Sequence, residues 1–366
     1  MKLRTKIVIH LITVGVILSS CSTTQNNSSS PELTKAANNR INIGQYLNYQ
    51  GFNTAVINGL DEESSYHGLS REDKEEARKL RNNVNKILAK KSFVINLDTA
   101  NIYSVRLMES IYQLDLPIKI EWGNEEQSIK FVDLMTKPVT GFCSSLYKDA
   151  MDSISTEIVN FDQETIIIFM KNYAVIANQL TELLPEIKSI QFDSSDPQNF
   201  AAMLLGINDS QNRFIEIKNL NPNPELKFSP RPRDDIQKIV LILEPTQYKS
   251  LLPALRYHGG SNFKFINFIS SLENLQDVNQ LLDFENTLMP LSENIIKKIK
   301  TKEIDSLESI TRNSILNDWL LIELMNQSGV RSANISGMTG AIEFQKGRCA
   351  KRRIPLSRVS AQLIAP

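Results

Sequence analysis

Cys21 is the residue with the clearest chemical setting in this sequence. It follows Leu18-Ser19-Ser20, an apolar residue and two small ones, which is the pattern of a lipobox whose cysteine thiol takes a lipid. The preceding residues are basic at the start and then apolar for about 12 residues, which is too short to span a membrane. We therefore expect residues 1–20 to be a lipoprotein signal peptide, and the exported protein to be held to a membrane by acyl chains on Cys21.

The residue after Cys21 predicts which membrane the protein reaches. An aspartate at this position is the usual signal for retention in the inner membrane, and this sequence has Ser22 instead. We therefore expect a lipid anchor in the outer membrane of a Gram-negative cell, with the protein facing the periplasm.

The other residues with catalytic or metal-binding potential are few. Besides Cys21 and the signal peptide, the chain has Cys143, Cys349, His67 and His258, and no HExxH, Cys/His cluster or GxSxG motif. A zinc hydrolase or a serine triad is therefore not expected, nor is any cofactor, metal or enzymatic activity. The oxidising periplasm permits a disulfide between Cys143 and Cys349, but their wide separation does not establish one, and the pairing stays open.

Charge and length limit the classes of partner and of architecture. The chain has 41 basic and 41 acidic residues, so its net charge does not indicate a nucleic-acid partner. About 345 residues remain after the signal peptide, which suits two domains or one domain with two lobes.

The N-terminal part of the mature chain is polar before it becomes helical. Residues 22–31 are a low-complexity stretch that is too hydrophilic to pack, and we expect residues 21–69 to be a partly disordered tether. Ser70 and Asp73 then match a helix-capping pattern, and apolar residues spaced three or four apart follow. A charged surface helix is therefore predicted over residues 70–90.

The rest of the chain alternates between strand and helix patterns. Two runs, 165–170 and 238–243, are apolar almost without interruption, which is typical of strands buried on both faces. Further strands are expected at 93–97, 118–122, 189–192 and 263–268, and helices at 103–114, 144–155, 173–184, 196–205, 246–257 and 310–325. This alternation predicts an α/β fold with parallel sheets.

Ligands of such sheets bind beyond the carboxyl ends of the strands. The polar residues there are Asn96 to Thr99, Lys171-Asn172 and Glu244 to Thr246. They match no known arrangement of catalytic or ligand-binding residues. Loops at strand ends are commonly polar whether or not they bind a ligand.

Three segments carry a resemblance to a known family. Residues 205–213 read Leu-Gly-Ile-Asn-Asp-Ser-Gln-Asn-Arg, and residues 230–237 read Pro-Arg-Pro-Arg-Asp-Asp-Ile-Gln before a buried strand. Residues 336–344 read Ser-Gly-Met-Thr-Gly-Ala-Ile-Glu-Phe, which is similar to a segment of type I periplasmic-binding folds. Together they resemble the LppC family, outer-membrane lipoproteins that activate class A penicillin-binding proteins. Asn208 and Gln237 stand where that family tends to have Asp.

The resemblance implies a type I periplasmic-binding-protein-like fold with two Rossmann-like lobes joined by crossing strands. On this basis we expect lobe 1 at 91–163, lobe 2 at 164–290, return helices of lobe 1 at 291–330, and a terminal segment at 331–366 in lobe 2 and the crossover. We expect the N-terminal helical-repeat domain of larger family members to be absent or reduced to the charged helix, and the first lobe to be trimmed.

The resemblance also implies a partner and a function. The partner would be a class A penicillin-binding protein, the inner-membrane peptidoglycan synthase, and the lipoprotein would activate it by binding one of its conformations preferentially. An alternative is a lipid-anchored solute-binding protein of the same fold that holds an amino acid or a similar small molecule.

Basic residues are the candidates for contact with such a partner. Arg231 and Arg233 have the chemistry for bidentate pairing with a carboxylate, or they lock the start of the next strand through Asp234 and Asp235. A second group consists of Arg348, Arg352 and Arg353. It lies in a basic run, residues 344–358, that contains no acidic residue. That run would meet peptidoglycan, lipid headgroups or an acidic partner, or it forms a solvated hairpin face.

Overall fold

The computed structural model describes most of the chain after residue 66. The described residues are 43–48, 51–52, 67–99, 101–123, 131, 133–159, 164–221, 227–259, 263–269, 275, 278–300 and 306–364. They belong to one compact unit, Ile41–Pro366. Cys21, the predicted signal peptide at 1–20 and most of the predicted tether at 21–69 lie outside the described residues. Within the described ranges, no helix has the length and hydrophobicity needed to cross a bilayer.

A six-stranded sheet forms the centre of lobe 2. Its order is β11-β7-β6-β5-β3-β4, in which β3 to β7 run parallel and β11 runs antiparallel to β7. The strands are β3 (Thr165–Phe169), β4 (Lys188–Gln191), β5 (Lys238–Ile242), β6 (Lys264–Asn267), β7 (Leu288–Pro290) and β11 (Leu356–Arg358). All residues of β3 and β5 are buried, which confirms that their apolar runs mark strands covered on both faces.

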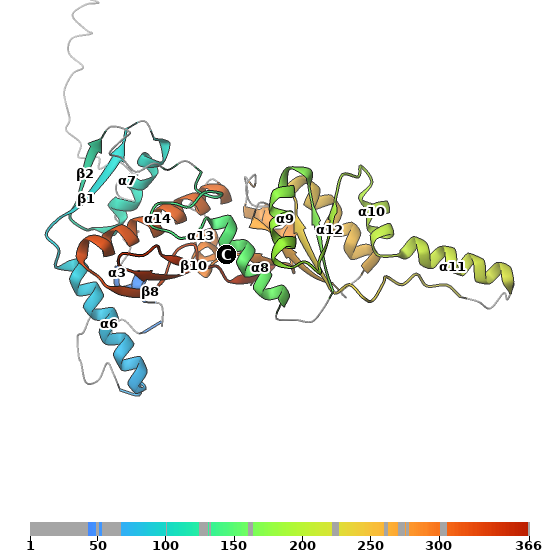
Figure 1. Ribbon diagram of the computed structural model, residues 1–366, viewed down its shortest axis with the longest axis horizontal. Coiled ribbons are helices and arrows are strands. Elements are labelled where there is room, and N and C mark those ends of the chain that lie inside the picture. Colours follow the sequence, from blue (N-terminus) through green and yellow to red (C-terminus); the bar gives the residue numbers. More distant parts are fainter. Residues whose placement is uncertain are drawn as a thin grey trace, which may run out of the picture. The chain divides into compact units, whose positions relative to one another are not determined.

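Helices connect the parallel strands of lobe 2, and Figure 1 shows α9 and α12 alongside the sheet. The connecting elements are η1 (Lys171–Tyr173), α9 (Ala174–Leu183), α10 (Pro197–Leu204), α11 (Ile207–Leu220), α12 (Pro245–Gly259) and η4 (Val278–Phe284). Local sequence sets the start of α10, because the Asp196 side chain accepts a hydrogen bond from the Asn199 amide at 3.0 Å and Pro197 fits the first turn.

Lobe 1 has a much smaller parallel sheet. Strand β1 (Phe93–Asp98) pairs with β2 (Ile118–Gly123), and α7 (Ile102–Leu114) connects them. The long helix α14 (Leu307–Ser328) packs against α7. Phe93, Ile95 and Leu97 are buried on one face of β1, whereas Val94 is exposed on the other. The α/β class with two lobes is thus confirmed, and the parallel sheet of lobe 1 has two strands among the described residues.

A separate antiparallel sheet forms most of the terminal segment. It has the order β10-β9-β8 and consists of β8 (Ser332–Ser336), β9 (Ala341–Gln345) and β10 (Lys351–Arg353). It packs against α3 (Ile43–Leu47) and α6 (Arg71–Leu88). Helix α6 occupies the region predicted as a charged helix, and Ser70 caps it by accepting a hydrogen bond from the Asp73 amide at 3.1 Å.

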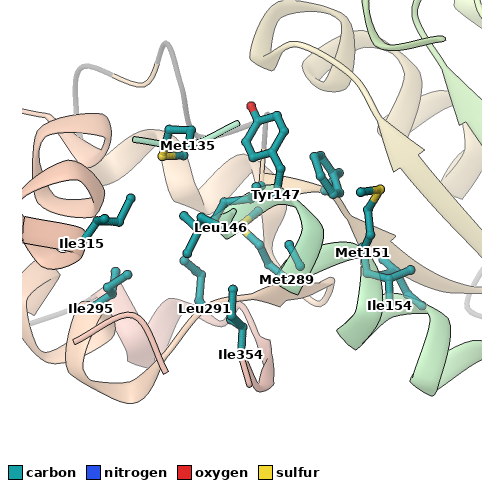
Figure 2. Packing of buried hydrophobic residues seen from close by; sticks show 14 of the residues in the cluster. Met135, Leu146, Tyr147, Met151, Ile154, Met289, Leu291, Ile295, Ile315 and Ile354 are labelled. Carbon is teal, nitrogen blue, oxygen red and sulfur yellow. The ribbon is translucent and has the colours of Figure 1, made fainter. Parts of the chain in front are cut away.

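The chain passes between the two lobes three times. It enters lobe 2 after α8 (Leu146–Val159), leaves it after β7 for α13 (Glu293–Lys300) and α14, and returns after β10 into β11, followed by α15 (Ala361–Ile364). Figure 2 shows that side chains of these crossing segments pack into one hydrophobic cluster. The terminal segment was predicted to belong to lobe 2 and the crossover, but only β11 joins the sheet of lobe 2.

A disulfide and the hydrogen bonds of one buried carboxylate hold the terminal segment in place. Cys143 and Cys349 form a disulfide with a Cα–Cα distance of 4.8 Å, which answers the pairing that the sequence left open. Asp318 of α14 accepts hydrogen bonds from the amides of Met338 at 2.5 Å and Thr339 at 2.7 Å. This turn requires glycine at position 340, because a Cβ atom there would lie 2.4 Å from the Arg353 carbonyl oxygen.

Candidate functional site

The candidate site is a pocket of about 840 Å³ lined by elements of both lobes. Lobe 1 contributes α7, α14 and the loop at 133–136, lobe 2 contributes η1 and α9, and α8 lies between them. The polar and aromatic residues of its lining are Tyr103, Asp133, Thr136, Ser145, Tyr147, Lys148, Asn172, Tyr173, Gln179, Glu308 and Arg312.

The strand order of lobe 2 explains why the pocket lies here. Counting from β3, the order is 2-1-3-4-5, so the direction of progression reverses between β3 and β5. Doubly wound sheets bind ligands at such a reversal, beyond the carboxyl ends of the strands. Asn172 and Glu244 follow these two strands, and the Asn172 amide donates a hydrogen bond to the Glu244 carboxylate at 2.7 Å. Two of the three predicted strand-end groups therefore meet, and Asn172 of the first lines the pocket.

Tyr147 lines the pocket, and its hydroxyl group is buried without an internal partner. Its ring packs edge-on against Phe268 with the centroids 5.0 Å apart, and the residue is 6% exposed. In Figure 2 its oxygen points away from the labelled aliphatic side chains. This buried hydroxyl forms no hydrogen bond within the described part of the chain. A buried hydroxyl normally finds a partner, so the arrangement favours a bound molecule at this position.

Arg312 supplies a second buried donor. Its guanidinium pairs with Glu308 at 2.5 Å and donates to the Tyr103 hydroxyl at 3.2 Å. These two contacts orient the side chain but leave its Nε–H, which is buried, without an acceptor among the described residues. A planar guanidinium fixed in this way is suited to recognition of a carboxylate or another anion.

Asp133 adds a negative charge to the same wall. Burial works toward a higher pKa for its carboxyl group, but hydrogen bonds from Thr136 and Met135 and the charge of Arg312 outweigh burial, so the pKa is lowered. The carboxylate accepts the Thr136 hydroxyl at 2.5 Å and the Met135 amide at 3.1 Å. Asp133 therefore stays ionised near neutral pH and can attract a cationic group.

A second hollow brings together two of the three segments that carry the family resemblance, 205–213 and 230–237. It measures about 990 Å³ and lies along α11 and the segment before β5. The Arg233 amide donates to the Leu205 carbonyl at 2.9 Å, so the two segments are joined directly. Gly206, at φ +68°, adopts the left-handed conformation that starts α11, and its position faces Arg233.

The two arginines of this hollow have different roles. Arg233 pairs with Asp235, with its Nε 2.7 Å from a carboxylate oxygen, which supports the predicted local lock, although the partner is Asp235 and not Asp234. The hydrogen bond from Arg233 lowers the pKa of Asp235 to about 2. Arg231 is exposed and lines the hollow, as does Arg213.

The basic run of the terminal segment divides between surface and core. Arg348 and Arg353 are exposed, but Arg352 is 6% exposed and cannot contact a partner, so its predicted partner-binding role is wrong. The reason is the two-residue period of β10, which turns the middle residue inward. Arg352 lies 3.5 Å from the Asp149 carboxylate and stacks on the Phe142 ring at 4.2 Å. Burial lowers the pKa of Arg352 and raises that of Asp149, against their mutual attraction.

Sequence reasoning missed the pocket residues Tyr147, Arg312 and Asp133. None belongs to a motif, and Arg312 is distant in sequence from the other two. In the sequence, apolar residues spaced three or four apart in α8 would mark Tyr147 only as a residue of the hydrophobic core. Across the described ranges, no group of His, Cys, Asp and Glu side chains is arranged to hold a metal ion.

Comparisons with known proteins give a weak structural likeness. No protein-family model and no curated protein matches the chain. An ABC transporter substrate-binding protein from Desulfitobacterium hafniense in complex with Leu is 9% identical with a TM-score of 0.36 and covers 73% of this chain and 96% of its own. A second structure of an ABC transporter substrate-binding protein from the same organism has a TM-score of 0.37 at the same identity and coverage. The strand order and the three crossings, and not this likeness, define the fold.

Proposed function

We propose that this chain is an exported, lipid-anchored protein of the outer membrane that binds a small polar solute in the pocket between its lobes. One observation carries the proposal: two residues that line one pocket, Tyr147 and Arg312, each carry a buried donor, the hydroxyl and the Nε–H, that has no acceptor among the described residues. Such donors cost about 1–3 kcal/mol each when left unpaired, and a ligand acceptor removes that cost.

The charges of the pocket define the chemistry of the solute. The Tyr147 and Arg312 donors suit a carboxylate, and the ionised Asp133 suits an ammonium group. Both kinds of group occur together in an amino acid. We therefore propose an amino acid or a similar zwitterion as the ligand, held by binding alone without a chemical step.

A thermal-shift series tests the proposal on the purified chain. The probes are amino acids, each compared with the amine that lacks its carboxylate and the acid that lacks its ammonium group. A ligand at 100 times its Kd stabilises the folded state by about 2.7 kcal/mol. We expect the amino acid to raise Tm and both truncated probes to do so much less. No shift with any probe contradicts the proposal.

The variant Tyr147→Phe separates binding from folding, because it removes only the hydroxyl. Without ligand, Tyr147→Phe is expected to raise stability by up to about 1 kcal/mol, since it removes an unsatisfied buried group. With ligand, it is expected to weaken binding about tenfold. Tyr112→Phe, at a residue that is 67% exposed and outside the pocket, is the matched control and should change neither quantity.

A second candidate function follows from the hollow that joins residues 205–213 to 230–237. We propose that this surface contacts a class A penicillin-binding protein and activates its peptidoglycan synthesis. The direct contact of the two segments through Leu205 and Arg233 favours a shared role for them. Exposed Arg213 and Arg231 would meet an acidic surface of the synthase.

Copurification and polymerase assays test this second function. We expect the chain to capture a class A synthase and to raise its rate, and Arg231→Glu to reduce both effects. The control is Arg331→Glu, an equal charge change at an exposed site outside both groups of candidate partner-contacting arginines. Failure to capture any synthase, with an intact response to amino acids, would leave solute binding as the function of the chain.

A further inference from the structure

The parallel sheet of lobe 1 has two outer edges, and the structure treats them differently. At the outer edge of β1, the Gln327 side chain of α14 takes the place of a neighbouring strand. Its Oε1 accepts the Val94 amide at 3.0 Å, and its Nε2 donates to the Val94 carbonyl at 2.7 Å. The outer edge of β2 has no comparable cover among the described residues.

The register shows which groups of β2 point outward. The Phe93 amide donates to the Pro117 carbonyl at 2.9 Å, so residues 117, 119 and 121 direct their backbone groups toward β1. Backbone groups alternate along a strand, and those of Ile120 and Trp122 therefore point away from β1. An exposed edge of this kind is a template for pairing with another strand.

The sequence of β2 is complementary to itself in the antiparallel direction. With Ile120 opposite Ile120 of a second copy, Lys119 lies opposite Glu121, and Ile118 lies opposite Trp122. Because the outward groups of Ile120 form a hydrogen-bonded pair, Lys119 and Glu121 occupy a non-hydrogen-bonded pair, where side chains approach most closely. Both are exposed, and within one chain they already pair at 2.8 Å. Each Lys119 therefore lies opposite Glu121 of the other copy, and the two-fold axis of the dimer relates these two ion pairs.

Exposed apolar side chains occur on β2 itself and on α7, the helix that precedes it. Trp122 is 50% exposed, and one side of α7 exposes large apolar residues: Ile102 at 71%, Val105 at 64%, Tyr112 at 67% and Met108 at 40%. The two-fold axis of an antiparallel strand pair is perpendicular to the sheet, so it keeps both copies of α7 on the same face. A two-stranded sheet is marginal by itself, and pairing makes four strands.

We propose that the chain forms a homodimer through antiparallel pairing of β2 with β2 of a second copy. The occupant of this edge is a second copy, because the order Lys119-Ile120-Glu121 makes the edge complementary to itself. The β4 edge of lobe 2 differs, since it is shorter and bears Lys188 without an acid on the same strand. This proposal is independent of the ligand pocket.

Sedimentation velocity on the chain with Cys21→Ser, which removes any acyl group, tests the proposal. Lys119→Glu places Glu opposite Glu, and Glu121→Lys places Lys opposite Lys, so each variant alone is expected to dimerise about tenfold or more weakly. An equal mixture of the two variants restores opposite charges across the interface and is expected to form a heterodimer. The internal pair stays broken in both chains, so restoration cannot come from within one chain.

The control and the contradicting results are specific. Lys79→Glu and Glu76→Lys break an equally exposed ion pair on α6 and should leave dimerisation unchanged. A wild-type chain that stays monomeric at all concentrations overturns the proposal. So does a mixture of the two β2 variants that stays monomeric while each variant keeps the circular dichroism and Tm of a folded protein.

Discussion

Lobe 2 and lobe 1 both contain β-α-β units, but they stabilise their sheets by different means. In lobe 2, β3 and β5 are flanked by strands on both sides and all their residues are buried. In lobe 1, β1 and β2 have only each other, and alternate residues of β1 are exposed. A sheet this small depends on the packing of α14 against α7 and on the Gln327 side chain, which takes the place of a strand at the edge of β1. The difference teaches that the trimmed lobe is maintained by contacts outside its own sheet.

The largest expected effect concerns the buried ion pair that ties the terminal segment to α8. Arg352→Ala leaves the Asp149 carboxylate buried and unpaired, which is expected to cost about 3–5 kcal/mol of unfolding free energy. Urea unfolding measures it. The neighbouring variant Arg353→Ala removes an exposed side chain and should cost no more than about 0.5 kcal/mol. Equal costs for the two variants would contradict the burial of Arg352.

A matched pair of isoleucine truncations compares the two sheets directly. Ile167→Ala in β3 creates a cavity in a fully buried strand and is expected to cost about 2–5 kcal/mol. Ile120→Ala in β2 removes a half-buried side chain and should cost about 1 kcal/mol. Urea unfolding at one protein concentration measures both. A larger cost at Ile120 would mean that lobe 1 is the better packed sheet.

Loss of the disulfide tests how far the terminal segment depends on covalent linkage. Replacing Cys143 and Cys349 by Ser opens a link between residues 206 positions apart, and the expected cost is about 2–4 kcal/mol. The wild-type chain in reducing agent should show the same unfolding midpoint as the double variant. Unchanged stability in both cases would show that hydrogen bonds such as Cys143 N–H to the Ala350 carbonyl suffice.

The smallest effect is expected at the side chain that covers the edge of β1. Gln327→Ala removes two hydrogen bonds to Val94 and should cost about 1–2 kcal/mol. Hydrogen exchange of the Val94 amide should accelerate at the same time, which localises the effect to lobe 1. Gln211→Ala on the exposed side of α11 is the control and should stay within about 0.5 kcal/mol. Unchanged exchange at Val94 would contradict the role of Gln327 as a strand substitute.

Much of lobe 2 could be predicted from sequence, because its strands carry a strong local signal. The apolar runs at 165–170 and 238–243 and the Asp196-Pro197 cap marked elements that the structure contains. The β8–β10 sheet was not predicted, since its strands are short and its turns depend on Asp318 and the disulfide. Those partners are distant in sequence and leave no local pattern.

The site shows the same division. Asn172 and Glu244 were identified as strand-end residues, because strand ends can be located from hydrophobic patterns. Tyr147 and Arg312 were not, because the absence of a hydrogen-bond partner is a property of the packed structure. The basic run misled in the same way: Arg348 and Arg353 stay at the surface, whereas Arg352 is turned into the core by the strand period.

The sequence by itself determined the α/β class, the buried strands of lobe 2 and the prediction of a lipid-anchored start at Cys21. These follow from hydrophobic periodicity and short motifs, which act within a few residues of one another. Only the tertiary structure decided the trimmed sheet of lobe 1, the disulfide, the burial of Arg352 and the pocket with two unpaired donors. Each of these depends on contacts between segments far apart in sequence, and such contacts are set by packing and not by local pattern.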